Sequence, residues 1–250
     1  MFKRNICLPL LCCVALSAGC KQNEIITFSD LPGANFLRFD SREGWNETLG
    51  NLYIDRNFGI FIDEWDIPAD TIYVQAKLEG MMSSEPIRIR LKYDYDPEQP
   101  HVEVIFRDDY AFAPGEYMAE FKIVVKRPPE RDRLFAIPLT FDCENSDIIA
   151  GAVERQIFRL NIKDEYTFQT AQITDEVWEN AIEPVLGPYS NTKMRFVAYA
   201  LQRWNLSGLA GGVTLADKQT IVDKLAEYNG AHPGNPLRDE NGEIVTFEPI

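Results

Sequence analysis

Few residues of this chain carry the side chains on which enzymes most often rely. Histidine occurs only twice, as His101 just before an expected strand and as His232 in a loop rich in proline and glycine. Cys143 has Asp142 and Glu144 as neighbours, and these carboxylates should raise the pKa of its thiol and keep it passive. The sequence contains no nucleophile elbow, phosphate-binding loop or dinucleotide fingerprint. We therefore expect structural or solvated roles for both histidines, assign no catalytic residue and no cofactor, and predict that the protein is not an enzyme.

Two acidic segments, residues 63–66 and residues 94–98, are rich in the oxygen ligands that calcium prefers. Counting Asp94 as the first position of an EF-hand loop places Gln99 where glycine is needed and Ile105 where the bidentate glutamate belongs. The motif fails, so we expect a solvated turn and assign no metal ligand, with a calcium site between strands as the alternative. A carboxylate pair for glycoside hydrolysis could be drawn from the 39 acidic residues almost at will and carries no weight.

Two tryptophans lie in polar surroundings that suit loops. Trp45 stands in Arg-Glu-Gly-Trp-Asn-Glu, and Trp65 stands in Asp-Glu-Trp-Asp. An exposed indole ring beside carboxylates and amides can stack on a sugar ring while its neighbours bond the hydroxyls. Large aromatic side chains are more often buried, so we favour packing roles and keep Trp45 and Trp65 as candidate glycan-stacking residues.

The start of the chain has the pattern of an export signal. Two basic residues precede an apolar run over residues 6–16, which is too short to span a bilayer. Small residues then lead to Cys20. This pattern resembles the bacterial lipobox, in which that cysteine receives diacylglycerol and becomes the mature N-terminus. The branched aliphatic residue usual three places before the cysteine is Ser17 here, with Leu16 one place earlier. The alternative is an ordinary signal peptide that ends near a cysteine.

The composition describes an acidic chain with a substantial core. Its formal net charge is −14, and 45% of its residues are hydrophobic. An acidic surface repels phosphate backbones, so we expect no nucleic acid partner; neutral sugars, cations or a basic protein patch remain compatible. Of the five cysteines only Cys143 lies beyond Cys20, so we expect no intrachain disulfide. Beyond the leader no apolar stretch approaches the length of a membrane span, and Cys20 is therefore the anchor we expect.

Apolar and polar side chains alternate over about residues 34–165. The clearest runs are 71–78, 87–95, 117–125 and 158–163, and shorter runs lie at 35–39, 52–62, 101–106 and 134–141. A period of two indicates one buried and one solvated face, as in antiparallel sheets. Pro138 cannot donate to a ladder, so its strand should be an edge or should turn that position outward. We predict a mainly β fold, a β-sandwich of immunoglobulin or fibronectin-III type.

After about residue 166 the pattern changes from strands to helices. Ser190 can cap a helix that runs to Trp204, and Thr214 can cap a second helix that ends at Asn229-Gly230. Residues 237–247 have the pattern of a hairpin turned at Asn241-Gly242. The expected organisation is a signal peptide at 1–19, a tether at 20–33, an immunoglobulin-like β-sandwich domain at 34–165 and a small mixed helical and hairpin module at 166–250.

Several short motifs spread over the chain point to one family. They are Cys20-Lys-Gln-Asn-Glu, Ala113-Pro-Gly-Glu-Tyr117, Phe141-Asp-Cys-Glu-Asn-Ser-Asp147, Leu186-Gly-Pro-Tyr-Ser-Asn-Thr-Lys193 and Asp239-Glu-Asn-Gly-Glu243. Together they resemble uncharacterised domain-of-unknown-function lipoproteins of Bacteroidetes-type bacteria. Such lipoproteins are typically encoded near outer-membrane glycan-uptake systems of the starch-utilisation type, beside a transporter and its substrate-binding lipoprotein. The family has no established activity, so the resemblance assigns no site residues.

We therefore predict a lipid-anchored cell-envelope protein that is a non-enzymatic accessory of glycan capture or uptake and binds a polysaccharide or a transporter partner. A structural or adhesive envelope protein is the alternative, and a hydrolase with a carboxylate pair is a third hypothesis. In related surface lipoproteins an acidic stretch after the lipidated cysteine marks export to the outer face. Residues 21–24 hold one acid only, so the outer-membrane lipoprotein expected here could face the surface or the periplasm.

Replacement of Cys20 tests the anchor. The Cys20→Ala variant should lose metabolic labelling with radioactive palmitate and should leave the membrane fraction, because no other residue is expected to carry the acyl chains. Cys143→Ala is the matched control and should label like the unaltered chain. Labelling retained by Cys20→Ala would refute the anchor.

Overall fold

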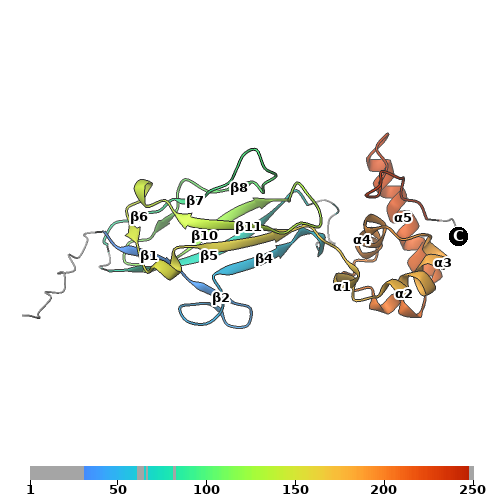
Figure 1. The fold of residues 1–250 in the computed structure, drawn as a ribbon, viewed down its shortest axis with the longest axis horizontal. Coiled ribbons are helices and arrows are strands. Elements are labelled where there is room, and N and C mark those ends of the chain that lie inside the picture. The colour runs from blue at the N-terminus through green and yellow to red at the C-terminus, as the bar shows by residue number, and fades with distance from the viewer. Residues whose placement is uncertain (1–30, 61–64, 66, 81–82, 248–250) are drawn as a thin grey trace, which may run out of the picture. The chain divides into compact units, whose positions relative to one another are not determined.

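The computed structural model describes residues 31–60, 65, 67–80 and 83–247. The predicted signal peptide, Cys20 and most of the predicted tether lie outside these residues, as do Asp63, Glu64 and Asp66. The described chain is mainly β, with strands up to Lys163 and helices after it (Figure 1).

Two sheets make up most of the β part. One has the strand order β12-β1-β5-β10-β8, the other has the order β4-β13-β11-β7, and the short pairs β2-β3 and β6-β9 accompany them. The strands are β1 Gly33–Phe36, β2 Arg38–Asp40, β3 Gly44–Asn46, β4 Tyr53–Asn57, β5 Ala69–Glu79, β6 Ile87–Arg88, β7 Leu91–Tyr93, β8 Val104–Ile105, β9 Ala111–Phe112, β10 Met118–Lys126, β11 Phe135–Phe141, β12 Ile149–Ala150 and β13 Phe158–Lys163.

The alternation of apolar residues creates the core between these two sheets. In β5, Ile72 and Val74 are fully buried, whereas Tyr73 between them points to solvent. Phe36 of β1 stacks on Phe141 of β11, with ring centroids 4.1 Å apart, and so joins one sheet to the other. The two sheets therefore share a single apolar core.

The antiparallel prediction is wrong for two strand pairs. β1 pairs in parallel with β12, and β4 pairs in parallel with β13. Parallel neighbours need a long connection, and here most of the β part lies between them in the sequence. The run predicted at 87–95 is also divided, because β6 pairs with β9 whereas β7 pairs with β11.

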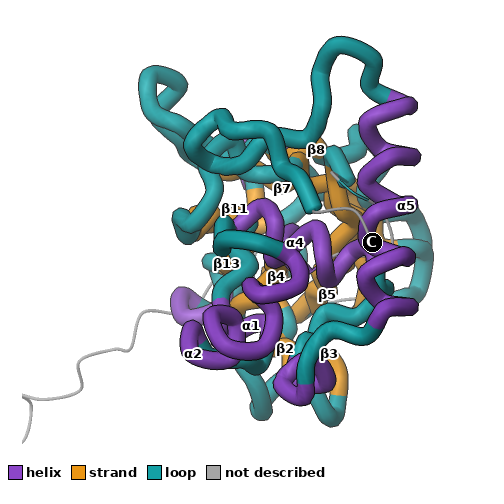
Figure 2. The backbone as a smooth tube through the Cα atoms, turned by 90° about the vertical axis from the view of Figure 1, so that its right-hand side faces the viewer, coloured by secondary structure: helices purple, strands orange, loops and turns teal. Residues whose placement is uncertain are grey.

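The helical part begins after β13. Its helices are α1 Phe168–Ala171, α2 Asp175–Val177, α3 Glu183–Leu186, α4 Asn191–Ala200 and α5 Leu215–Ala231, with a π turn at Trp178–Ile182 between α2 and α3. Figure 2 shows α4 and α5, which contact each other. These helices surround a second apolar core that includes Trp178 and Phe196, both fully buried.

Both predicted helix starts are confirmed. The Ser190 hydroxyl accepts a hydrogen bond from the Lys193 N–H, and the Thr214 hydroxyl accepts one from the Asp217 N–H. Helix α4 ends at Ala200 rather than at Trp204, since Gln202 has a φ of 52°, in the left-handed region.

The end of α5 and the tail also differ slightly from the prediction. Helix α5 runs on to Ala231, just past the predicted stop. The predicted terminal hairpin is present as a bridge between Arg238 and Ile244, with Gly242 at a φ of 82° in its turn. Across the described residues, no helix is long and apolar enough to cross a bilayer.

The stack of Phe36 on Phe141 gives a test of the two-sheet core. Phe36→Ala should lower the free energy of unfolding by about 3–5 kcal/mol, because a buried ring is lost and a cavity remains between the sheets. Urea denaturation followed by tryptophan fluorescence measures the change. Tyr73→Ala, at an exposed position of β5, is the control. Equal effects of the two substitutions would contradict the inter-sheet role of Phe36.

Candidate functional site

A groove lies beside the first half of β11. Residues 93–96 and 99–102 form one wall, residues 133–138 form the other, and the cavity volume is about 260 Å³. β7 ends at Tyr93, opposite Leu139 of β11, and the chain then leaves this sheet as a loop that leads to β8 of the other sheet (Figure 1). The groove opens where β7 stops accompanying β11.

Tyr93 closes the base of this loop. Its hydroxyl donates to the Val102 carbonyl and accepts from the Val104 N–H, both at 3.3 Å. Burial raises the pKa of the phenol, although the hydrogen bond from Val104 opposes that rise. The neutral phenol therefore links the end of β7, where the loop begins, to the start of β8, where the loop ends.

The aromatic rings of the groove contact one another. Tyr95 lies over Tyr93 with centroids 5.0 Å apart, and His101 lies over Tyr95 at 4.2 Å. The Tyr95 ring is nevertheless 50% exposed. The run predicted as a strand at 87–95 includes Tyr95, but β7 ends at Tyr93, and Tyr95 lines the groove instead.

Two carboxylates stand at the mouth of the groove. Asp94 and Asp96 are exposed, and Asp96 accepts a hydrogen bond from the Glu98 N–H in a tight turn. Residues 94–98 form the exposed turn that the sequence predicts, and the assignment of no metal ligand there stays a prediction. On the opposite wall Arg133 pairs with Glu130 at 2.7 Å, and its guanidinium lies 4.8 Å from the centre of the Phe135 ring. The groove therefore combines aromatic rings with carboxylates that make no ion pair among the described residues.

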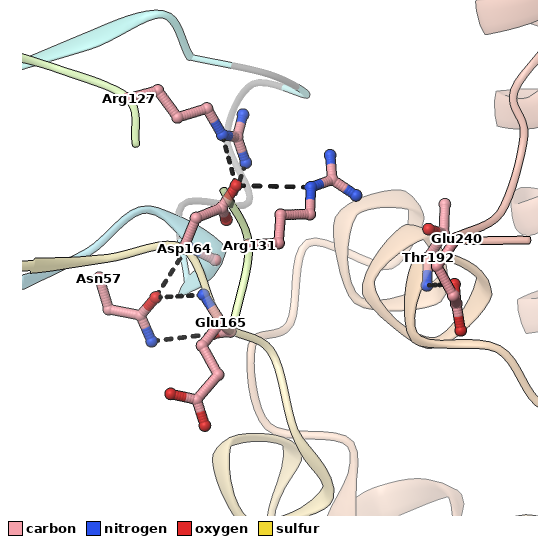
Figure 3. Close-up of polar contacts among 8 residues, drawn as sticks. Asn57, Arg127, Arg131, Asp164, Glu165, Thr192 and Glu240 are labelled. Atoms are coloured by element: carbon pink, nitrogen blue, oxygen red, sulfur yellow. Dashed lines mark hydrogen bonds and ion pairs between the residues drawn. The ribbon is translucent and has the colours of Figure 1, made fainter. Parts of the chain in front are cut away.

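A second polar cluster surrounds Asp164, directly after β13 (Figure 3). The Asp164 carboxylate is 3% exposed and accepts two hydrogen bonds from Arg127, at 2.7 and 3.0 Å. Arg131 adds an ion pair at 3.5 Å. Burial alone would raise the pKa of Asp164, but Arg127 outweighs it, with help from Arg195 and Arg131, and the pKa is lowered.

Glu165, the residue after Asp164, is bonded at both of its backbone groups by the Asn57 side chain. The Asn57 amide donates to the Glu165 carbonyl at 2.9 Å and accepts from the Glu165 N–H at 3.0 Å (Figure 3). Gly59 passes so close that a Cβ there would lie 2.2 Å from the Glu165 carbonyl oxygen, which excludes larger side chains. The arginines that bind Asp164 and the Asn57 side chain that bonds Glu165 therefore hold this stretch of backbone in place.

A small cavity of about 110 Å³ adjoins this cluster, and Asp132 and Glu240 line it. The pKa of Asp132 is raised, first by burial and then by the charges of Glu165 and Asp164. Glu240 accepts hydrogen bonds from the N–H groups of Asn191 and Thr192 at the start of α4. Burial raises the pKa of Glu240, but these bonds outweigh it and lower the pKa. The cavity is much smaller than the roughly 300–1,000 Å³ of typical ligand sites.

The two predicted stacking tryptophans are half-buried and contact other rings. Trp45 lies 5.2 Å from Phe39 and 5.5 Å from Phe158, between ring centres, beside the core of the two sheets. Trp65 contacts the helical core through Phe196, at 5.4 Å, and Arg195 lies 4.3 Å over its ring. These contacts are those of packing residues, and sugar stacking by Trp45 or Trp65 stays a prediction.

The remaining candidate residues are dispersed. His101 belongs to the groove, whereas His232 follows α5 and stacks on Tyr228 at 4.2 Å. Cys143 is a free thiol beside the core, and burial, followed by the charge of Asp142, raises its pKa as expected. Within the described ranges, no three His, Cys, Asp or Glu side chains lie close enough together to hold a metal ion.

Comparison with known proteins does not identify the function of this groove. No family model matches the chain, and no curated protein matches it. One similar solved structure is that of EndoBT-3987 from Bacteroides thetaiotamicron with a Man5GlcNAc product, at 13% identity and a TM-score of 0.34. The match covers 49% of this chain and 30% of that one, and a likeness this weak carries no argument.

The lowered pKa of Asp164 predicts a dependence of stability on pH. Its contribution is fully present above about pH 4, the pKa of an unfolded aspartate, and is lost as pH falls through the lower pKa of the folded state. Asp164→Asn should lower the free energy of unfolding by about 3–5 kcal/mol at pH 7, because Arg127 and Arg131 lose their buried carboxylate partner. The penalty should shrink towards pH 2.

Urea denaturation of both forms at pH 7 and at pH 2 measures this difference. Asp147→Asn, which removes an exposed partner of Arg88, is the matched control and should change stability little at either pH. A penalty for Asp164→Asn that stays constant with pH would contradict the ionic role of this carboxylate.

Proposed function

We propose that this protein is a lipid-anchored cell-envelope protein that acts as an accessory of glycan capture or uptake, and that the groove beside β11 is its binding surface. The observation that carries the proposal is the groove itself. It places the half-exposed Tyr95 next to the carboxylates of Asp94 and Asp96, which make no ion pair among the described residues. Aromatic rings with a few convergent polar groups are what binding sites present to a polysaccharide or to a transporter partner.

An immunoglobulin-like or fibronectin-III-like sandwich is the fold we propose for the β part. In its favour, β1-β5-β10-β8 follows the A-B-E-D order of such domains, and β13-β11-β7 follows G-F-C. Domains of this type carry their ligands on loops and edges rather than in a deep interior cleft. The groove between the β7–β8 loop and β11 is a site of that kind.

The adhesive and hydrolase hypotheses have less support. An adhesive protein should offer a long free strand edge, but the described edge strands of the two main sheets, β12, β8, β4 and β7, are only two to five residues long. A hydrolase needs facing carboxylates in a cleft that admits a sugar. Among the described residues, the carboxyl group with a raised pKa is that of Asp132, and it lines the cavity of about 110 Å³. This cavity is smaller than a typical ligand site, so it does not support the hydrolase hypothesis.

Tyr95 provides the test of the groove. Tyr95→Ala should weaken binding to the captured ligand about tenfold, because a central aromatic contact is removed. The purified chain is screened on a glycan array, and envelope membranes are searched by affinity purification for bound proteins. Tyr73→Ala, an exposed tyrosine on β5, is the matched control. If neither a glycan nor an envelope protein is recovered with the unaltered chain, the proposal fails.

A further inference from the structure

The two sides of β11 are paired to different extents. On one side β13 accompanies it from Phe135 to Leu139. On the other side β7 accompanies it only from Leu139 to Phe141. Among the described residues, no strand pairs with β11 on the β7 side before Leu139. The start of β11 is therefore a strand edge inside an otherwise paired sheet.

The direction of the backbone groups follows from the pairing. The Asp142 N–H donates to the Arg90 carbonyl, so the backbone N–H and C=O groups of even-numbered residues of β11 point towards the β7 side. Independently, the Arg159 N–H donates to the Leu52 carbonyl, so the backbone groups of odd-numbered residues of β13 point away from β11. The even positions of β13 then bond to the odd positions of β11. Ala136 and Pro138 consequently direct their backbone groups into the groove.

The residue types agree with an open edge at these positions. Pro138 has no backbone N–H to donate, and at this open edge no neighbouring strand among the described residues requires one. This agrees with the prediction from the sequence that Pro138 lies at an edge or faces outward. Phe135 and Ile137 are buried, whereas Ala136 is exposed, so the segment keeps the regular alternation of an extended strand. The Ala136 N–H and carbonyl and the Pro138 carbonyl are thus offered to a ligand in strand geometry.

We propose that the groove binds an extended peptide segment with basic side chains, belonging to a partner protein, as an additional strand beside residues 135–138 of β11. This inference rests on the proposed function, since it names the ligand of the same groove. The segment continues the line of β7 and pairs with Ala136 through both of its backbone groups. Leu134, which is 59% exposed, offers apolar contact at the far end.

The charges of the groove select a basic segment. Asp94 and Asp96 stand at its mouth without an ion pair among the described residues. The one arginine of the lining, Arg133, is already paired with Glu130 and stacked over Phe135. A lysine or arginine on the bound segment meets uncompensated carboxylates, whereas an acidic segment is repelled.

Two observations favour a peptide over a sugar chain. Tyr95 has Tyr93 and His101 as roughly parallel neighbours, at interplanar angles of 21° and 31°, so its ring already stacks within the protein. The volume of about 260 Å³ lies below the range usual for small-molecule pockets, whereas strand addition needs an edge rather than an enclosed volume.

Binding of defined peptides to the full chain tests the inference. The probe is a short fluorescein-labelled peptide of alternating valine and lysine, followed by fluorescence anisotropy. The first control replaces lysine by glutamate, and the second is the valine–lysine peptide N-methylated at alternate residues, which keeps the charges and loses the backbone donors. We expect binding of the first peptide only, weakening with added salt.

Substitutions in β11 and in the loop locate the peptide. Ala136→Pro removes the N–H that faces the groove and no hydrogen bond to β13, so it should weaken binding about tenfold. Ala136→Ser keeps the N–H and should stay within about twofold. Replacing Asp94 and Asp96 together by Asn should weaken binding and flatten the salt dependence, whereas Glu154→Gln, at an exposed position elsewhere, should not. Thermal unfolding of each variant confirms that it is folded.

The outcomes separate this inference from the proposed function. Absence of peptide binding, equal binding of the N-methylated or the glutamate peptide, or equal effects of Ala136→Pro and Ala136→Ser would each overturn strand addition. A glycan that binds the groove and is lost with Tyr95→Ala would also overturn it, and would leave the proposed function standing. Peptide binding without recovery of any glycan or envelope partner would support strand addition and refute the proposed function.

Discussion

The carboxylate of Asp164 is the contact on which the arrangement of the chain after β13 depends. It is almost fully buried, and its charge is compensated by the guanidinium groups of Arg127 and Arg131. An isolated buried carboxylate would be costly, so the side chain can stay where it is only while these arginines do. The next residue, Glu165, is bonded at both backbone groups by Asn57. The stretch that joins the two apolar cores is therefore fixed by specific polar contacts rather than by packing alone.

The groove follows from a second constraint, the length of β7. β7 pairs only with Leu139–Phe141, so the residues of β11 before Leu139 have no strand partner on that side in the described part of the chain. The Tyr93 hydroxyl bonds the Val102 carbonyl and the Val104 N–H and so joins the two ends of the loop that follows β7. The same hydrogen bonds bring Tyr95 and the nearby carboxylates to the edge. The Tyr93 hydroxyl thus holds the loop that forms one wall of the groove, and the start of β11 forms the other wall.

The sequence predicted the strands and the helix starts better than it predicted the groove. Alternation marks buried positions locally, and a hydroxyl before a helix marks a cap, so β5, β10 and the starts of α4 and α5 could be expected. Alternation does not say which strands pair, and the parallel neighbours β4 and β13 were missed for that reason. The groove depends on where β7 ends relative to β11, a long-range register that no local pattern encodes. Trp45 and Trp65 attracted attention through polar neighbours in sequence, but their ring contacts come from distant segments.

The pairing of β4 with β13 also bears on the order in which the chain folds. The contact between Asn57 and Glu165 joins residues 108 positions apart. Contacts of such long range require the closure of a large loop and tend to form late. During synthesis from the N-terminus, β4 must wait for nearly all of the β part before its partner exists. Until then the edge of β4 that later pairs with β13 is exposed to other chains, and such unpaired edges make the newly made protein prone to aggregation.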